Sequence, residues 1–167
     1  FKTHGMEVAA HMLTLGGIAA NKADAAKLAG EALADGRAWK RFRQLVIAQH
    51  GDIAYVDNPE LLPKAKFIEI VPAPRSGYVA GIHARVVGET AVILGAGRAK
   101  KGDHVDHAVG IEIHCNVGDY LEIGSPLFTL HADDEGILAE ARQSLLDAHT
   151  WSDVPVEPLP LFYGVIE

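Results

Sequence analysis

Three histidines and a cysteine between positions 104 and 115 have the most obvious capacity for chemistry. His104, His107, His114 and Cys115 are residue types that zinc sites prefer, and His83 could lie near them in the fold. The spacing H-x2-H-x6-H-C matches no closed structural zinc pattern, and strand alternation would place His114 and Cys115 on opposite faces. We therefore expect surface or core histidines here and no metal site.

A glycine-rich basic segment at residues 95–102 is a second candidate. Its glycines would let the backbone approach a phosphate, and Arg98, Lys100 and Lys101 could neutralise the phosphate charge. The segment lacks both the G-K-[ST] ending of a P-loop and the G-x-G-x-x-G fingerprint of dinucleotide sites. A turn that carries solvated basic side chains is the favoured interpretation.

Acidic residues gather where a late helix is expected to begin. Helix capping and the helix dipole account for Asp133, Asp134 and Glu135 without any catalysis. The few serines do not lie in a nucleophile elbow, and no set of nucleophile, base and orienting residue can be assembled. We expect no catalytic, cofactor-binding or metal-binding residue in this chain.

The segment Gly118-Asp119-x4-Gly124-x2-Leu127 looks like half of a lipoyl or biotinyl carrier domain. Such a carrier attaches its prosthetic group to a lysine at the tip of a hairpin, usually next to a methionine. Both methionines of this chain lie far upstream, and Lys100 and Lys101 lack the surrounding motif. We therefore expect a similar fold without the covalent cofactor.

Hydrophobic spacing and glycine punctuation predict an α+β fold. Helices should come first, followed by a small barrel-sandwich-like β domain with a C-terminal helix. The predicted helices occupy residues 7–15, 21–35, 37–49, 88–94 and 133–148, and the predicted strands occupy residues 66–71, 78–87, 108–115 and 125–131. Asn21 is expected to cap the second helix, and Gly36 is expected to end it.

Two expectations concern how side chains face. The third helix is expected to turn apolar residues inward and basic residues outward, and the last residues are expected to form an extended segment packed along the outside. The inward residues are Trp39, Phe42, Val46 and Ile47, the outward ones are Lys40, Arg41 and Arg43, and the packing residues of the tail are Leu161, Phe162 and Val165.

Composition narrows the class of protein. The chain has 167 residues, of which 49% are hydrophobic and 22% charged, as in folded globular domains. Its net charge of −7 argues against a general nucleic-acid or anionic-membrane surface. The single cysteine excludes an internal disulfide and fits a reducing cytoplasm. The chain starts with Phe1, and we expect a processed or truncated chain.

Four glycine-containing blocks follow one another along the β region: Gly77-Tyr78-Val79, Leu94-Gly95-Ala96-Gly97-Arg98, Val109-Gly110 and Gly118-Asp119. Their order resembles the C-terminal domain of the pyrimidine nucleoside (thymidine) phosphorylases. Residues 7–15 and 28–49 also resemble helices of that family, so the resemblance covers almost the whole chain. It implies a helical segment, residues 1–65, that continues the phosphorylase α/β lobe, and a C-terminal domain at residues 66–167.

The resemblance also implies a function for the parent enzyme. Family members cleave thymidine or uridine with phosphate, a co-substrate, to give the free base and a pentose 1-phosphate. Their phosphate- and base-binding residues lie upstream of the matched region, so no position here inherits those roles, and the isolated chain is expected to be inactive. The expected partner is the upstream part of the same enzyme, itself a homodimer. The alternatives are a nucleoside monophosphate phosphorylase fragment and a free-standing barrel-sandwich binding module.

A piece of a larger lobe should expose apolar surface that the rest of the lobe would cover. The helices of residues 7–49 are the expected place, with Val8, Met12 and Leu15 in one stripe. We expect this region either to self-associate or to hold an upstream fragment.

Overall fold

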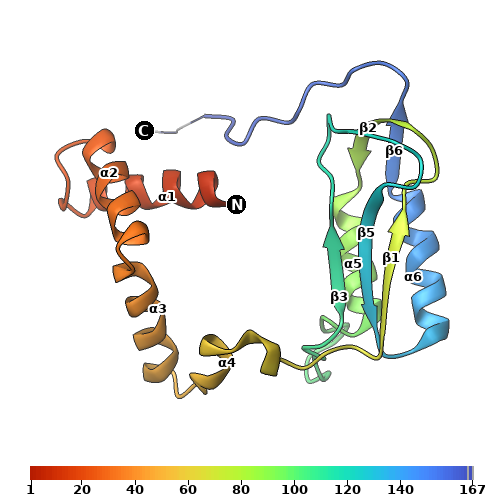
Figure 1. Cartoon of the computed structure of the whole chain (residues 1–167), viewed down its shortest axis with the longest axis horizontal. Coiled ribbons are helices and arrows are strands. Elements are labelled where there is room, and N and C mark those ends of the chain that lie inside the picture. Colours follow the sequence, from red (N-terminus) through yellow and green to blue (C-terminus); the bar gives the residue numbers. More distant parts are fainter. Residues whose placement is uncertain (165, 167) are drawn as a thin grey trace. The chain divides into compact units, whose positions relative to one another are not determined.

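The chain folds into two compact units, Phe1–Leu61 and Leu62–Glu167, in a computed structural model that describes residues 1–164 and 166 (Figure 1). The first unit is helical. The second combines two small antiparallel sheets with two helices, so the α+β prediction is confirmed. The two units are described separately below.

The helical unit contains the three predicted helices: α1 (Lys2–Leu15), α2 (Lys22–Ala34) and α3 (Arg37–Ala48). Asn21 caps α2 as predicted, because its Oδ1 accepts the Asp24 N–H at 3.0 Å. Gly36, with φ +80°, lets the chain turn directly into α3. Two short elements that were not predicted, α4 (Ala54–Asp57) and the 3-10 helix η1 (Pro59–Leu61), follow.

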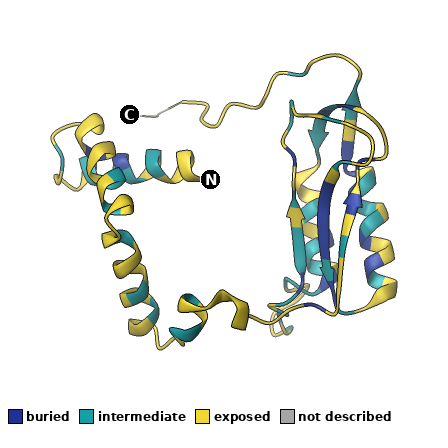
Figure 2. Ribbon diagram, in the orientation of Figure 1, coloured by how far each residue is buried: buried dark blue, intermediate teal, exposed yellow. Residues whose placement is uncertain are grey.

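The helical unit has almost no core of its own (Figure 2). Ala10 and Ala25 are its buried residues, and α3 has none. The prediction that Trp39, Phe42 and Ile47 point inward is wrong, since all three side chains are about half exposed. The apolar stripe exists, but no element within this unit covers it.

The β unit is built from two three-stranded antiparallel sheets. The first has the order β1-β5-β3, formed by β1 (Phe67–Pro72), β5 (Pro126–Ala132) and β3 (Gly110–Ile113). The second has the order β4-β2-β6, formed by β4 (Tyr120–Leu121), β2 (Gly77–Ile82) and β6 (His149–Ser152). The short strands β4 and β6 were not predicted.

The core of the β unit lies between the first sheet and its helices, α5 (Ala84–Leu94) and α6 (Glu135–Asp147). Helix α6 packs on β1 and β5, and α5 packs on β3 and on α6. The central strand β5 contributes Leu127, Phe128 and Leu130, all fully buried, and α6 contributes the fully buried Leu145. These apolar groups form one contiguous cluster, which gives this unit its own stability.

The second strand is shorter than predicted and the helix after it is longer. Strand β2 ends at Ile82, and α5 begins at Ala84 rather than at residue 88. Strand pairing continues as far as the backbone N–H of His83, which donates to the Ala148 carbonyl at 2.9 Å, and the helix begins directly afterwards because His83 Nδ1 accepts the Val86 N–H at 3.4 Å. The side chain thereby caps the new helix.

The segment after β6 has no regular secondary structure up to residue 164. Leu161 and Phe162, through which it was expected to pack, are each about half exposed. Val165, the third residue of that expectation, lies outside the described residues. The tail also approaches the β unit near Gly118, where Val156 and Pro158 lie close to the glycine.

One ion pair fastens α6 to the edge of the first sheet. Arg142 donates from Nε and Nη2 to the two carboxylate oxygens of Glu69 on β1, at 2.8 and 2.6 Å, and these hydrogen bonds raise the pKa of the guanidinium. Arg142→Gln should lower the free energy of unfolding by about 1 kcal/mol, a value reduced by partial exposure and by salt.

The matched control is Arg85→Gln, which removes an exposed pair with Glu89 one turn along α5 and should lower the free energy of unfolding clearly less than Arg142→Gln does. Urea unfolding at low and high salt compares the two variants. Equal losses for both would show that the Arg142 pair does not link α6 to β1.

Candidate functional site

His83, His114 and Cys115, three of the side chains that could have bound a metal, have separate surroundings, and His107 lines a groove. His114 Nε2 lies 2.7 Å from Thr129 Oγ1, and His83 caps α5. Cys115 is buried, and its burial, with the nearby Asp119 carboxylate, raises the pKa of the thiol. Within residues 1–164 and 166, no three His, Cys, Asp or Glu side chains are grouped as metal ligands.

The glycine-rich basic segment forms an exposed loop between α5 and β3. Gly95, with φ +105°, ends α5, and the Lys100 N–H donates to Asp103 Oδ2 at 2.9 Å within the loop. Arg98, Lys100 and Lys101 are exposed. The two lysines therefore follow a helix and do not lie at the tip of a hairpin, which is where a carrier domain presents its modified lysine.

The acidic residues before α6 hold backbone in place. Asp134 Oδ1 accepts the Ile137 N–H at 2.9 Å, which confirms the predicted helix cap. Asp133 Oδ1 accepts the Lys66 N–H at 2.8 Å, so it ties the segment before β1 to the end of β5. These carboxylates are occupied in structural roles.

A groove that the sequence did not indicate lies along the first sheet of the β unit. It has a volume of about 530 Å³ and is lined by the segment before β1 and by residues of β1, β3 and β5. Its polar lining comprises Lys64, His107 and the pair of His131 Nε2 and Glu112 Oε1, which lie 3.1 Å apart. Ile68 is an exposed apolar residue in the same lining. Hydrophobic periodicity does not reveal that β3 pairs with β5. The sequence therefore gave no indication that Glu112 on β3 and His131 on β5 lie close together.

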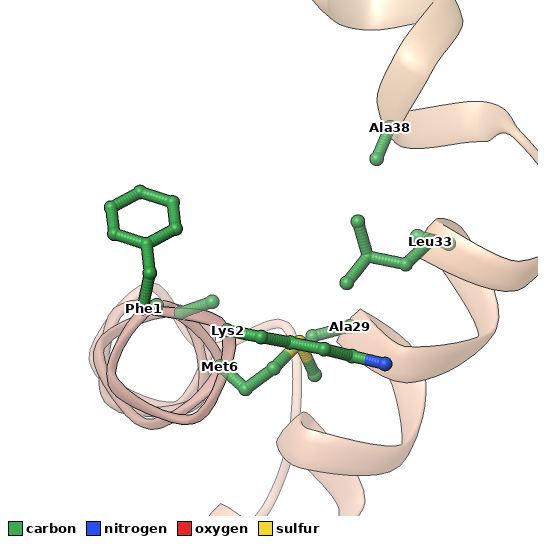
Figure 3. A pocket seen from close by; sticks show the side chains of 9 residues that line it. Phe1, Lys2, Met6, Ala29, Leu33 and Ala38 are labelled. Carbon is green, nitrogen blue, oxygen red and sulfur yellow. The ribbon is translucent and has the colours of Figure 1, made fainter. Parts of the chain in front are cut away.

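One hollow of the helical unit is apolar (Figure 3). It has a volume of about 640 Å³ and is lined by Phe1, which precedes α1, by Lys2 and Met6 on α1, and by Leu33 and Ala38. Lys2 is its one charged residue, and the rest of the lining consists of small or apolar side chains: Gly5, Ala9, Ala29 and Ala32. Such a surface can accept packing side chains, but it offers no acid, base or nucleophile.

The described helices include none that is both long and apolar enough to cross a bilayer. One comparison with known proteins is informative. Residues 78–152 match the family model of the pyrimidine nucleoside phosphorylase C-terminal domain. The match begins at the second residue of β2 and ends at the last residue of β6, so it contains all of the second sheet except Gly77, both helices of the β unit, and the strands β3 and β5.

Proposed function

We propose that this chain supports the mobile lobe of a pyrimidine nucleoside phosphorylase and that the catalytic residues lie outside it, because residues 78–152 match the family model of the C-terminal domain of such enzymes. The parent enzyme cleaves the N-glycosidic bond of thymidine or uridine with phosphate. Phosphate takes the place of the base on the pentose, giving the free base and a pentose 1-phosphate. The family match is the observation that carries this proposal.

The two units have different parts in the proposal. The β unit, with its own contiguous core, is the C-terminal domain and provides a rigid body. Residues 1–65, helical and largely exposed, continue the α/β lobe and need the rest of that lobe as cover. Phosphate and nucleoside must be held together with water excluded, a task that lobe closure performs in many enzymes. A rigid C-terminal body would move with the lobe as it closes.

The partners and the setting follow from the same proposal. The upstream part of the same enzyme is the direct partner, and the parent is a homodimer that acts in the cytoplasm. Phosphate is a co-substrate, and no further cofactor is required. Nucleoside monophosphates are the alternative substrates, since the related monophosphate phosphorylases share this domain.

The isolated chain should not catalyse phosphorolysis, because the family resemblance implies that the residues that hold phosphate and base lie outside it. Purified chain incubated with phosphate and thymidine, uridine or a nucleoside monophosphate should release no free base, as followed by liquid chromatography. A complete phosphorylase serves as the positive control. Phosphate-dependent release of base by the chain alone would place the catalytic residues within these 167 residues and overturn the proposal.

A further inference from the structure

Strand β1 lies at the edge of the first sheet and has a partner on one side only. It pairs with β5, and among residues 1–164 and 166 no strand pairs with its other side. Proteins usually protect such edges with lysines or prolines, because the free backbone N–H and C=O groups can pair with another chain. The sequence of β1, Phe-Ile-Glu-Ile-Val-Pro, contains no lysine, and its one proline comes last. The edge is therefore open to strand pairing.

The pairing pattern shows which backbone groups of β1 face the free side. The N–H of His114, directly after β3, donates to the carbonyl of Leu127 on β5. Backbone groups alternate in direction along a strand, so odd-numbered residues of β5 bond to β3 and even-numbered ones bond to β1. Glu69 of β1 is in register with an even-numbered residue of β5. The N–H and C=O groups of its neighbours, Ile68 and Ile70, therefore point to the free side.

The side chains of β1 also suit a contact between two edges. Ile68 and Ile70 share the outer face of the sheet and are 56% and 61% exposed. Glu69 is the one charged residue of the strand and lies on the other face, where Arg142 binds both of its carboxylate oxygens. This ion pair reduces the repulsion that two copies of Glu69 would exert on each other.

We propose that two copies of this chain pair through β1, antiparallel, about a two-fold axis at Glu69. In this register Ile68 of one copy lies opposite Ile70 of the other, and each such pair exchanges both of its backbone hydrogen bonds. The two isoleucine pairs pack on the outer face, and the two first sheets become one continuous sheet. Strand β1 lies outside the residues that match the family model, and the inference does not depend on the proposed function.

The position of the axis follows from the ends of the strand. An axis at Ile70 would place Ile68 opposite Pro72, which has no N–H to donate. An axis at Ile68 would place Ile70 opposite Lys66, whose N–H already donates to a carboxylate at the end of β5. The axis at Glu69 avoids both losses. A second copy is the occupant that this edge fits, because the same two isoleucines supply both halves of the contact.

The register can be tested with a disulfide in the full chain. A chain with Ile68→Cys is mixed with a chain with Ile70→Cys under mild oxidation, and the products are identified by mass spectrometry. Residues opposite each other in a hydrogen-bonded pair have Cα atoms about 5.5 Å apart, within the reach of a disulfide. The mixed disulfide should form at least about tenfold faster than either variant forms its own. The native cysteine, Cys115, is buried and should not interfere.

Sedimentation equilibrium tests the contact without a disulfide. The contact is small, so the dimer should dissociate with a constant on the order of 0.1 mM. Ile68→Lys places a charge on the edge, and Ile70→Pro removes an N–H from the free side but not from the side of β5. Each should weaken the dimer at least about tenfold. Ile123→Lys is the matched control, since Ile123 is equally exposed but lies in the turn before β5, and it should change little.

Three results would overturn the proposal. They are a monomer at concentrations well above 0.1 mM, a mixed disulfide that forms no faster than the disulfides of the single variants, and a dimer that survives Ile68→Lys. A dimer that is lost on Met12→Asp but survives Ile68→Lys would place the contact on α1 instead. None of these measurements involves nucleoside chemistry, so their failure is separate from failure of the proposed enzymatic role.

Discussion

Phe128→Ala should lower the free energy of unfolding of the β unit by about 3 to 5 kcal/mol. Phe128 is fully buried on the central strand β5, lies opposite Val71 and Ile113 in the sheet, and stacks on His149 with ring centroids 5.7 Å apart. Removing the ring leaves a cavity next to residues of β1, β3 and β6, which come from three distant parts of the chain. Urea unfolding followed by circular dichroism measures the loss.

Tryptophan fluorescence can assign that loss to one unit. Trp151 on β6 packs against the core of the β unit, whereas Trp39 is exposed on α3. In a Trp39→Phe background, the Trp151 transition should shift strongly on Phe128→Ala. It should not shift on Phe42→Ala, which removes an exposed ring from α3. A loss below about 1 kcal/mol for Phe128→Ala, as expected of a surface residue, would contradict the core described above.

Gly118→Ala should be the second most damaging of these changes, costing about 3 kcal/mol. Gly118 has φ +98°, a conformation that costs other residues energy. A Cβ there would also lie 3.0 Å from Pro158 Cγ, from the Pro158 nitrogen and from the Val156 carbonyl oxygen. The strain and the clash add, and thermal unfolding measures their sum.

Gly124→Ala separates the two contributions. Gly124 also has a positive φ, of +88°, but a Cβ there would meet nothing within 4 Å. Its substitution should therefore cost only the conformational part, about 1 kcal/mol. If the two variants lose the same stability, then the tail near Val156 and Pro158 does not pack against Gly118.

Local signals in the sequence were sufficient where one residue determines the backbone. Asn21 and Asp134 cap their helices as predicted, because the capping hydrogen bond depends on a side chain three residues from its donor. Gly36 permits the predicted turn for the same local reason. The recognised glycine blocks also led to the family that the comparison found.

Other features depend on contacts that a single segment does not encode. Residues 84–87 are Ala, Arg, Val and Val, which suit a strand or a helix. The cap from His83 to the Val86 N–H and the packing of α5 on α6 favour the helix. Strands β4 and β6 are short, and they are strands because they pair with β2. For α3, periodicity identified the apolar face but could not say whether anything covers it.

The candidate sites illustrate the same limit. The chemical types of His114, Lys100 and Asp133 were evident from the sequence, but their roles depend on partners at Thr129, Asp103 and Lys66. The groove at His131 consists of residues that only the tertiary structure brings together. On α3, the apolar residues can be found by helical spacing, but the sequence does not reveal that they are exposed.

The most direct test of the account is a graft. Residues 62–167 would replace the C-terminal domain of a thymidine phosphorylase, and release of thymine from thymidine and phosphate would be measured. We expect the grafted enzyme to form thymine and deoxyribose 1-phosphate at a rate within about tenfold of the host, because this domain supports the lobe without supplying catalytic residues. A folded, soluble graft with no phosphorolysis, beside an active host, would contradict the assignment of this chain to such an enzyme.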